Sequence, residues 1–121
     1  MLLSGCVSKE TSYDTRPTQQ ELALASYPPR PDYKAAAQAY FARILKDPAG
    51  ANYSDWKLCH AWASPPLQFG WVAVVSVNAR NSYGGLAGGG LYFLWIGADG
   101  KAVNIVGAPF HVERLDVVES D

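Results

Sequence analysis

The segment from Phe69 to Asn78 constrains the fold most, because its side chains are apolar on both faces. The two alternating sets are Trp71, Val75 and Val77 on one face, and Val72 and Val74 on the other. A strand that is apolar on both faces needs cover on both sides, as a strand at the centre of a sheet has. We therefore predict that this segment is the central strand of the domain.

Three more segments have the composition of strands. Residues 56–62 alternate in side-chain character, and residues 91–96 are rich in aromatic and branched side chains. Residues 102–106 follow Asp99 and Gly100, and an Asp-Gly pair is a strong signal for a hairpin turn. Together these segments predict an antiparallel sheet of three to four strands.

Residues 107–121 allow two interpretations. Val112, Leu115 and Val118 have a spacing that suits a helical turn, whereas residues 112–115 could extend the sheet. The conformation of this tail stays open at the level of the sequence.

One helix is predicted after residue 32. Asp32 is suited to cap its N-terminus, and Pro48 prevents its continuation. Apolar side chains recur at helical spacing and form one stripe: Tyr33, Ala36, Ala37, Tyr40, Phe41, Ile44 and Leu45. The sequence therefore predicts an α+β domain, in which one N-terminal amphipathic helix packs on a small antiparallel sheet of three to four strands.

The N-terminus resembles a lipobox, the signal for acylation of a bacterial lipoprotein on cysteine. Ser4 and Gly5 are the small residues expected before the acylated Cys6, and Leu3 is the apolar residue expected at the third position back. A working signal peptide needs 7–15 apolar residues. We therefore expect residues 1–6 to be the remainder of a longer signal. The alternative is that Cys6 is an ordinary thiol, in a disulfide with Cys59.

The organisation that follows from the lipobox is an anchor, a tether and one domain. Residues 7–31 hold four prolines and few apolar side chains, so they are predicted to form a flexible tether before a single domain at 32–121. Val7 stands where lipoproteins retained in the inner membrane often carry aspartate. The resemblance therefore implies the outer membrane, with the protein facing the periplasm.

Two stretches resemble a family of small proteobacterial and prophage lipoproteins that have no assigned biochemical role. Residues 45–53 are similar to an L-K-D-P-x-S-A-x-[YF] segment, with Gly50 in place of the usual hydroxyl residue. Residues 75–85 are similar to V-x-V-N-A-[KR]-N-S-Y-G-G, and Leu86 then stands where an aromatic residue is common. The resemblance implies an envelope location and no mechanism.

The second motif contains the candidate binding residues. Arg80, Asn81, Ser82 and Tyr83 follow the central strand and are predicted to form a polar and aromatic loop that contacts a protein partner. The alternative is a purely structural turn, because Asn, Ser and Gly favour tight connections.

Catalytic and metal-binding chemistry finds little support in the sequence. Cys59 and His60 are adjacent on a predicted strand, so they point to opposite faces and cannot act as a pair. Two histidines supply too few ligands for a zinc site, and the Gly-rich residues 84–90 lack the ending of a phosphate loop. With a net charge of −1, the chain lacks the excess of positive charge that binding to nucleic-acid phosphates requires. We expect no cofactor, no metal and no catalytic residue.

The functional prediction is a lipid-anchored, non-enzymatic binding or accessory module with an envelope protein as its partner. The first alternative is an inhibitor or immunity-type lipoprotein of prophage origin that blocks an envelope enzyme or a phage. A more remote alternative is an enzyme that uses Cys59 or His111. The sequence does not define the oligomeric state or the identity of the partner.

Overall fold

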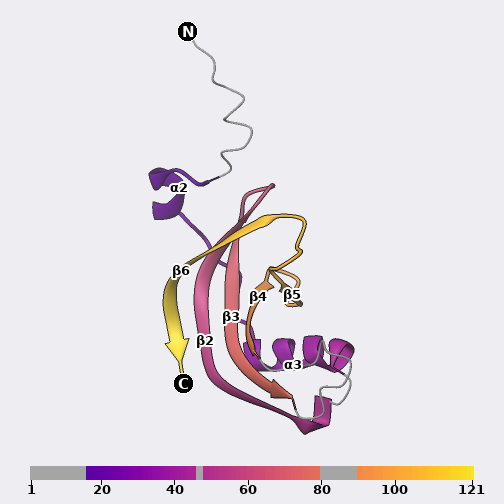
Figure 1. Cartoon of the computed structure of the whole chain (residues 1–121). Helices are drawn as coiled ribbons and strands as arrows, with labels where there is room; N and C mark the ends of the chain where they lie inside the picture. Colours follow the sequence, from indigo (N-terminus) through magenta and orange to yellow (C-terminus); the bar gives the residue numbers. More distant parts are fainter. Residues whose placement is uncertain (1–15, 46–47, 80–89) are drawn as a thin grey trace.

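The computed structural model describes residues 16–45, 48–79 and 90–121. Within these ranges the chain forms two α-helices, one 3-10 turn and five strands (Figure 1). In chain order they are α2 (Gln19–Ala23), α3 (Tyr33–Ile44), η1 (Pro48–Gly50), β2 (Ala51–Ser64), β3 (Gln68–Ala79), β4 (Gly90–Ile96), β5 (Ala102–Asn104) and β6 (His111–Ser120).

The five strands form one sheet in the order β5-β4-β3-β2-β6, and every neighbouring pair is antiparallel. The doubly apolar segment is β3, at the centre of the sheet as predicted. β2 and β3 form a long hairpin, and the chain crosses from β5 at one edge to β6 at the other (Figure 1).

The predicted class, α+β with an antiparallel sheet, is confirmed, but the predicted number of three to four strands is wrong. The fifth strand is β6, which forms from the tail that the sequence left open. Its register with β2 shifts between Leu58 and Cys59 and again between Cys59 and Ala61. Each such shift places an extra residue on one strand, so the side chains of β6 do not alternate regularly and the pattern of a strand is hidden.

The predicted N-terminal position of the helix is also wrong. The long helix, α3, follows α2 and a segment at residues 24–32 that packs on the sheet. α2 is stabilised by a capping box, in which Glu21 N donates to Thr18 Oγ1 and Thr18 N donates to Glu21 Oε1. Residues 16–31 therefore lie on the domain, within the stretch predicted as a tether.

The start and the apolar stripe of α3 are confirmed. Ala35 N donates to the Asp32 carboxylate at 3.3 Å, so Asp32 caps the helix as expected. All seven stripe residues belong to the core beneath the helix, and Ala37 and Phe41 are fully buried.

None of the helices within the described residues has both the length and the apolar character that crossing a bilayer requires.

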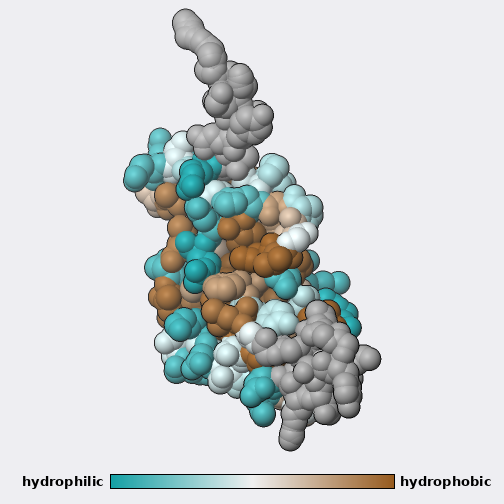
Figure 2. Space-filling model, in the orientation of Figure 1, coloured by the Kyte–Doolittle hydropathy of each residue, from teal (hydrophilic) through white to brown (hydrophobic). Residues whose placement is uncertain are grey.

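The sheet has two apolar faces, and each carries its own cluster of buried side chains. Beneath α3 lie Trp56, Leu58, Trp71, Ala73, Val75, Val77, Leu94, Ile96 and Ala102. On the second face, one row of paired residues crosses all five strands: Val117, Cys59, Val72, Trp95 and Val103. Figure 2 shows apolar side chains gathered over the middle of the face in view.

The sheet curls toward the second face. Cζ of Arg114, on β6, lies 4.6 Å from the ring centroid of Phe93, on β4, although β2 and β3 separate these strands. Neighbouring strands are ~4.8 Å apart, so side chains three strand spacings apart meet only if the sheet is strongly curved. The rings of Trp95 and Phe110, 6.2 Å apart, close the same face. Side chains from near the two edges of the curled sheet therefore cover the buried cluster on its second face.

The close approach of Trp95 to Gly70 yields a first prediction. A Cβ at this position would lie 2.7 Å from Cη2 of Trp95 and 2.9 Å from the carbonyl oxygen of Ile96. We expect Gly70→Ala to lower the free energy of unfolding by about 1–3 kcal/mol, measured by urea denaturation, because the added methyl group overpacks this contact. Gly97→Ala is the comparison, since its Cβ would come no closer than 3.1 Å to Trp95. Equal losses in the two variants would contradict this account.

Candidate functional site

The residues predicted from the sequence to carry function lie outside the described residues. This holds for the lipidation residue Cys6 and for the loop residues Arg80, Asn81, Ser82 and Tyr83, so their roles stay predictions. The structure places the strand ends that flank the loop. Asn78 pairs with Asn52, and Gly90 pairs with Val77, at one end of the sheet.

The most extensive polar site among the described residues joins the segment before α3 to β6. Three acidic side chains of β6, together with that of Asp121 directly after it, each meet a partner from elsewhere in the chain. We call this group the seam. It contains Arg16, Tyr27, Pro28, Arg30, Tyr33 and Lys34 from the N-terminal side, His60 and Trp71 from the sheet, and Glu113, Asp116, Glu119 and Asp121.

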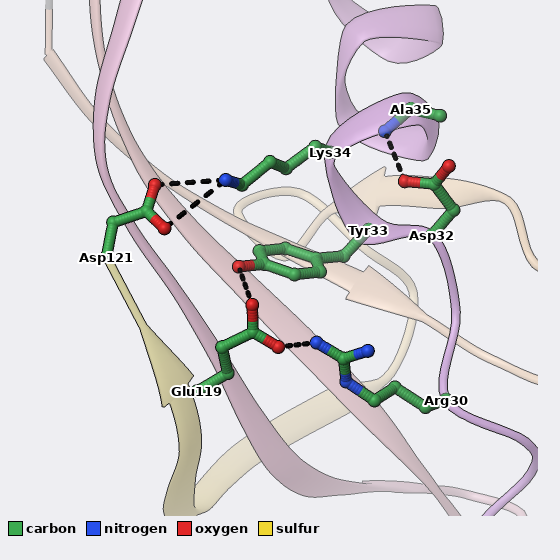
Figure 3. Close-up of polar contacts among 7 residues, drawn as sticks. All are labelled: Arg30, Asp32, Tyr33, Lys34, Ala35, Glu119 and Asp121. Atoms are coloured by element: carbon green, nitrogen blue, oxygen red, sulfur yellow. Dashed lines mark hydrogen bonds and ion pairs between the residues drawn. The ribbon is translucent and has the colours of Figure 1, made fainter.

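At one end of the seam the start of α3 is fixed to the end of β6 (Figure 3). One carboxylate oxygen of Glu119 accepts a hydrogen bond from the Tyr33 hydroxyl at 3.3 Å, and the other pairs with the Arg30 guanidinium. Lys34 Nζ lies 3.0 and 3.3 Å from the two carboxylate oxygens of Asp121. The segment before α3, α3 itself and the end of β6 thus meet here, and each carboxylate in this cluster has a partner.

The centre of the seam is a histidine between a carboxylate and an aromatic ring. Nδ1 of His60 lies 3.1 and 3.2 Å from the two carboxylate oxygens of Asp116. The ring of Tyr27 stacks on the imidazole with ring centroids 3.9 Å apart. The ring of Trp71 packs beside the imidazole, with ring centroids 4.8 Å apart. The hydrogen bond from His60 holds the pKa of Asp116 below its ordinary value. Burial, followed by the charge of Asp116, raises the pKa of the Tyr27 hydroxyl.

The aromatic contacts contribute more than the ion pairs to holding the segment on the sheet. Arg16 Nη1 lies 3.0 Å from Glu113 Oε1, but the side chains are 65% and 36% exposed, and exposed ion pairs contribute at most about 1 kcal/mol. Tyr27 instead packs between His60, Phe69 and Trp71. Trp71 Nε1 also donates to the carbonyl oxygen of Pro28 at 3.1 Å.

The chemistry of the seam is that of a docking contact between parts of the chain. Cys59, the residue next to His60, is buried on the second face of the sheet, and burial raises the pKa of its thiol. The predictions that Cys59 is a small buried side chain and that it faces away from His60 are confirmed. Among residues 16–45, 48–79 and 90–121, no group of three His, Cys, Asp or Glu side chains is placed to hold a metal ion.

The prediction from the sequence missed the seam because it left the conformation of residues 107–121 open. Glu113, Asp116 and Glu119 recur every three residues, and Arg16, Arg30 and Lys34 supply matching positive charge before and within the first turn of α3. This complementarity is visible in the sequence. Without a strand assignment for β6, however, nothing indicates that the two charged stretches lie side by side.

Comparisons with known proteins give no relative from which a role could be transferred. The chain matches no protein-family model, no curated protein and no solved structure. The resemblance to small lipoproteins therefore stays a prediction from the two motifs.

A second prediction concerns the pKa of Asp116. Replacing His60 by alanine removes the hydrogen bond that lowers this pKa, so the pKa should rise toward 3.8, as followed by NMR of the Asp116 carboxyl group. Because the pKa is lowered in the folded state, the bond stabilises the fold above pH 3.8, and this stabilisation is lost as the pH falls through the lowered pKa. His111→Ala, at the other histidine, should leave the pKa of Asp116 unchanged. A shift of the same size in both variants would show that His60 is not the cause.

A third prediction tests what holds the segment on the sheet. Tyr27→Ala should raise the hydrogen-exchange rates of residues 16–31 while the exchange of β2 and β3 stays unchanged, because the stack on His60 is lost. Removing one half-buried aromatic contact should cost about 2 kcal/mol, or roughly a thirty-fold faster exchange. Leu24→Ala is the control, since that side chain is 74% exposed. Exchange that is unaffected by Tyr27→Ala would overturn the assignment.

Proposed function

We propose that the protein is a lipid-anchored bacterial envelope protein that acts as a non-enzymatic binding module. In this proposal Cys6 carries the acyl chains, the domain faces the periplasm from the outer membrane, and a protein partner binds the loop that contains Arg80, Asn81, Ser82 and Tyr83. The lipobox and the two family-like motifs motivate the proposal.

The observation that carries the proposal is that the two functional segments connect to opposite ends of the sheet (Figure 1). Arg16, the first described residue, pairs with Glu113, which lies opposite Trp62 near the end of β2. The strand end that precedes the loop, Ala79, pairs with Ala51 at the start of β2. Trp62 and Ala51 are eleven positions apart in one strand, or roughly 35 Å at ~3.3 Å per residue.

This arrangement supports different roles for the two ends of the sheet: one end joins the anchor, and the other binds the partner. A chain that leads from an acylated Cys6 joins the domain at the end that carries Arg16, so the membrane lies on that side. The ends of β3 and β4 that flank the loop then point away from the membrane, where a soluble or membrane-bound partner can reach them. Binding residues are often carried by loops on a rigid sheet of this kind.

The fourth prediction tests the anchor. Cells that express the protein from its natural start codon and grow with radioactive palmitate should yield labelled protein in the membrane fraction. Cys6→Ser should abolish the label, because serine at this position is not a substrate for acylation. Cys59→Ser is the matched control and should keep the label. Unlabelled wild-type protein in the soluble fraction would overturn the anchor.

The fifth prediction tests the binding end. A photo-crosslinking amino acid at position 81 or 83 should capture one discrete envelope protein in living cells. The same amino acid at Gln68, which is exposed at the start of β3 and thus at the other end of the sheet, should capture much less of it. Equal capture from both positions, or none from 81 and 83, would reject the loop as the binding site.

A further inference from the structure

We infer that the apolar groove between α2 and the β2–β3 turn rests on the bilayer surface when Cys6 is acylated. This inference deepens the proposed function and rests on its lipid anchor. The occupant is a phospholipid surface rather than a protein, and three observations favour it: the chemistry of the groove, its position in the domain, and the short length of chain between the groove and Cys6.

The groove is apolar and open. Leu24 and Ala25, after α2, face Leu67 and Phe69 of the turn and of β3 across it. Leu24 is 74% exposed, and α2 contains no buried residue, so this helix contributes nothing to the core of the domain. The apolar atoms at this end of the molecule are visible beside hydrophilic ones in Figure 2.

The polar groups around the groove suit a membrane interface. Among its lining residues only Glu21 is charged, and its carboxylate accepts the backbone N–H of Thr18 in the capping box. The remaining polar lining consists of uncharged side chains: Thr18, Gln20 and Ser26. Neutral polar groups next to apolar ones match the boundary between headgroups and acyl chains.

The position of the groove follows from the seam. Tyr27 and Pro28 are held on the sheet by His60 and Trp71, and Arg16 is held by Glu113. α2 lies between these two attachments, so the seam fixes the groove at the end of the sheet where the chain leads toward Cys6. Leu67, in the turn after β2, lies at the same end.

Chain length then brings the groove close to the membrane. Only the nine residues 7–15 separate Cys6 from Arg16, and ten steps of chain span at most about 35 Å. If residues 16–32 were detached from the sheet, 27 steps would separate Cys6 from Tyr33 and the limit would be roughly 90 Å. The docked segment therefore keeps the domain near the bilayer, with the groove at the end of the sheet to which the chain from Cys6 leads.

The test uses the acylated full-length protein in vesicles of phosphatidylethanolamine and phosphatidylglycerol that contain a fraction of lipids with nitroxide-labelled acyl chains. A fluorescent amino acid is placed at Gln20, on the groove, and in a second protein at Asn52, which is exposed at the other end of the sheet. We expect the probe at position 20 to be quenched several-fold more than the probe at position 52. Leu24→Glu should reduce the quenching at position 20 without releasing the protein from the vesicles, and Leu91→Glu, at an exposed leucine at the far end, should not.

The outcomes separate the inference from the anchor. Protein that floats with the vesicles but shows equal quenching at the two positions overturns the groove contact and leaves the anchor standing. Quenching at position 20 that persists in Leu24→Glu also overturns it. Protein that does not float with the vesicles overturns the lipid anchor, and the groove contact falls with it.

Discussion

The structure depends on the need to cover both faces of the β2–β3 hairpin. β3 is apolar on its two sides, and a strand of that kind is stable only between two layers of other side chains. α3 supplies one layer. No helix within the described ranges packs on the second face, so the sheet curls until Arg114 and Phe110 reach Phe93 and Trp95. The curl follows from burying two apolar faces with a single long helix.

The seam completes the cover on the helix side. α3 packs over β3, β4 and β5 and meets β2 at Tyr53 and Trp56. Residues 24–32 cover the sheet further along β2, with Tyr27 over His60 and Trp71. The acidic side chains of β6 then meet the basic side chains that accompany this segment. Packing and charge therefore act on the same stretch of chain, and that stretch also determines where a lipid anchor would join the domain.

The sequence predicts the local elements of this fold well and their assembly less well. The central strand, the Asp-Gly hairpin, the Asp32 cap and the stripe of α3 depend on signals within a few residues of each other, and all of them are found. β6 was left open because two register shifts disturb its alternation.

The seam could not be predicted, since it joins residues far apart in the chain, such as His60 and Asp116, which are 56 positions apart, and Arg16 and Glu113, which are 97 positions apart. The candidate binding loop and Cys6 depend on motifs alone.

The irregular edge of the sheet has a consequence for encounters between copies of the protein. β6 exposes Leu115, Val117 and Val118, and a straight apolar edge of this composition would template the addition of a second chain. The two bulges of β6 interrupt the ladder that a neighbour would have to match. Copies of the protein that meet edge to edge are thus hindered from joining into one continuous sheet.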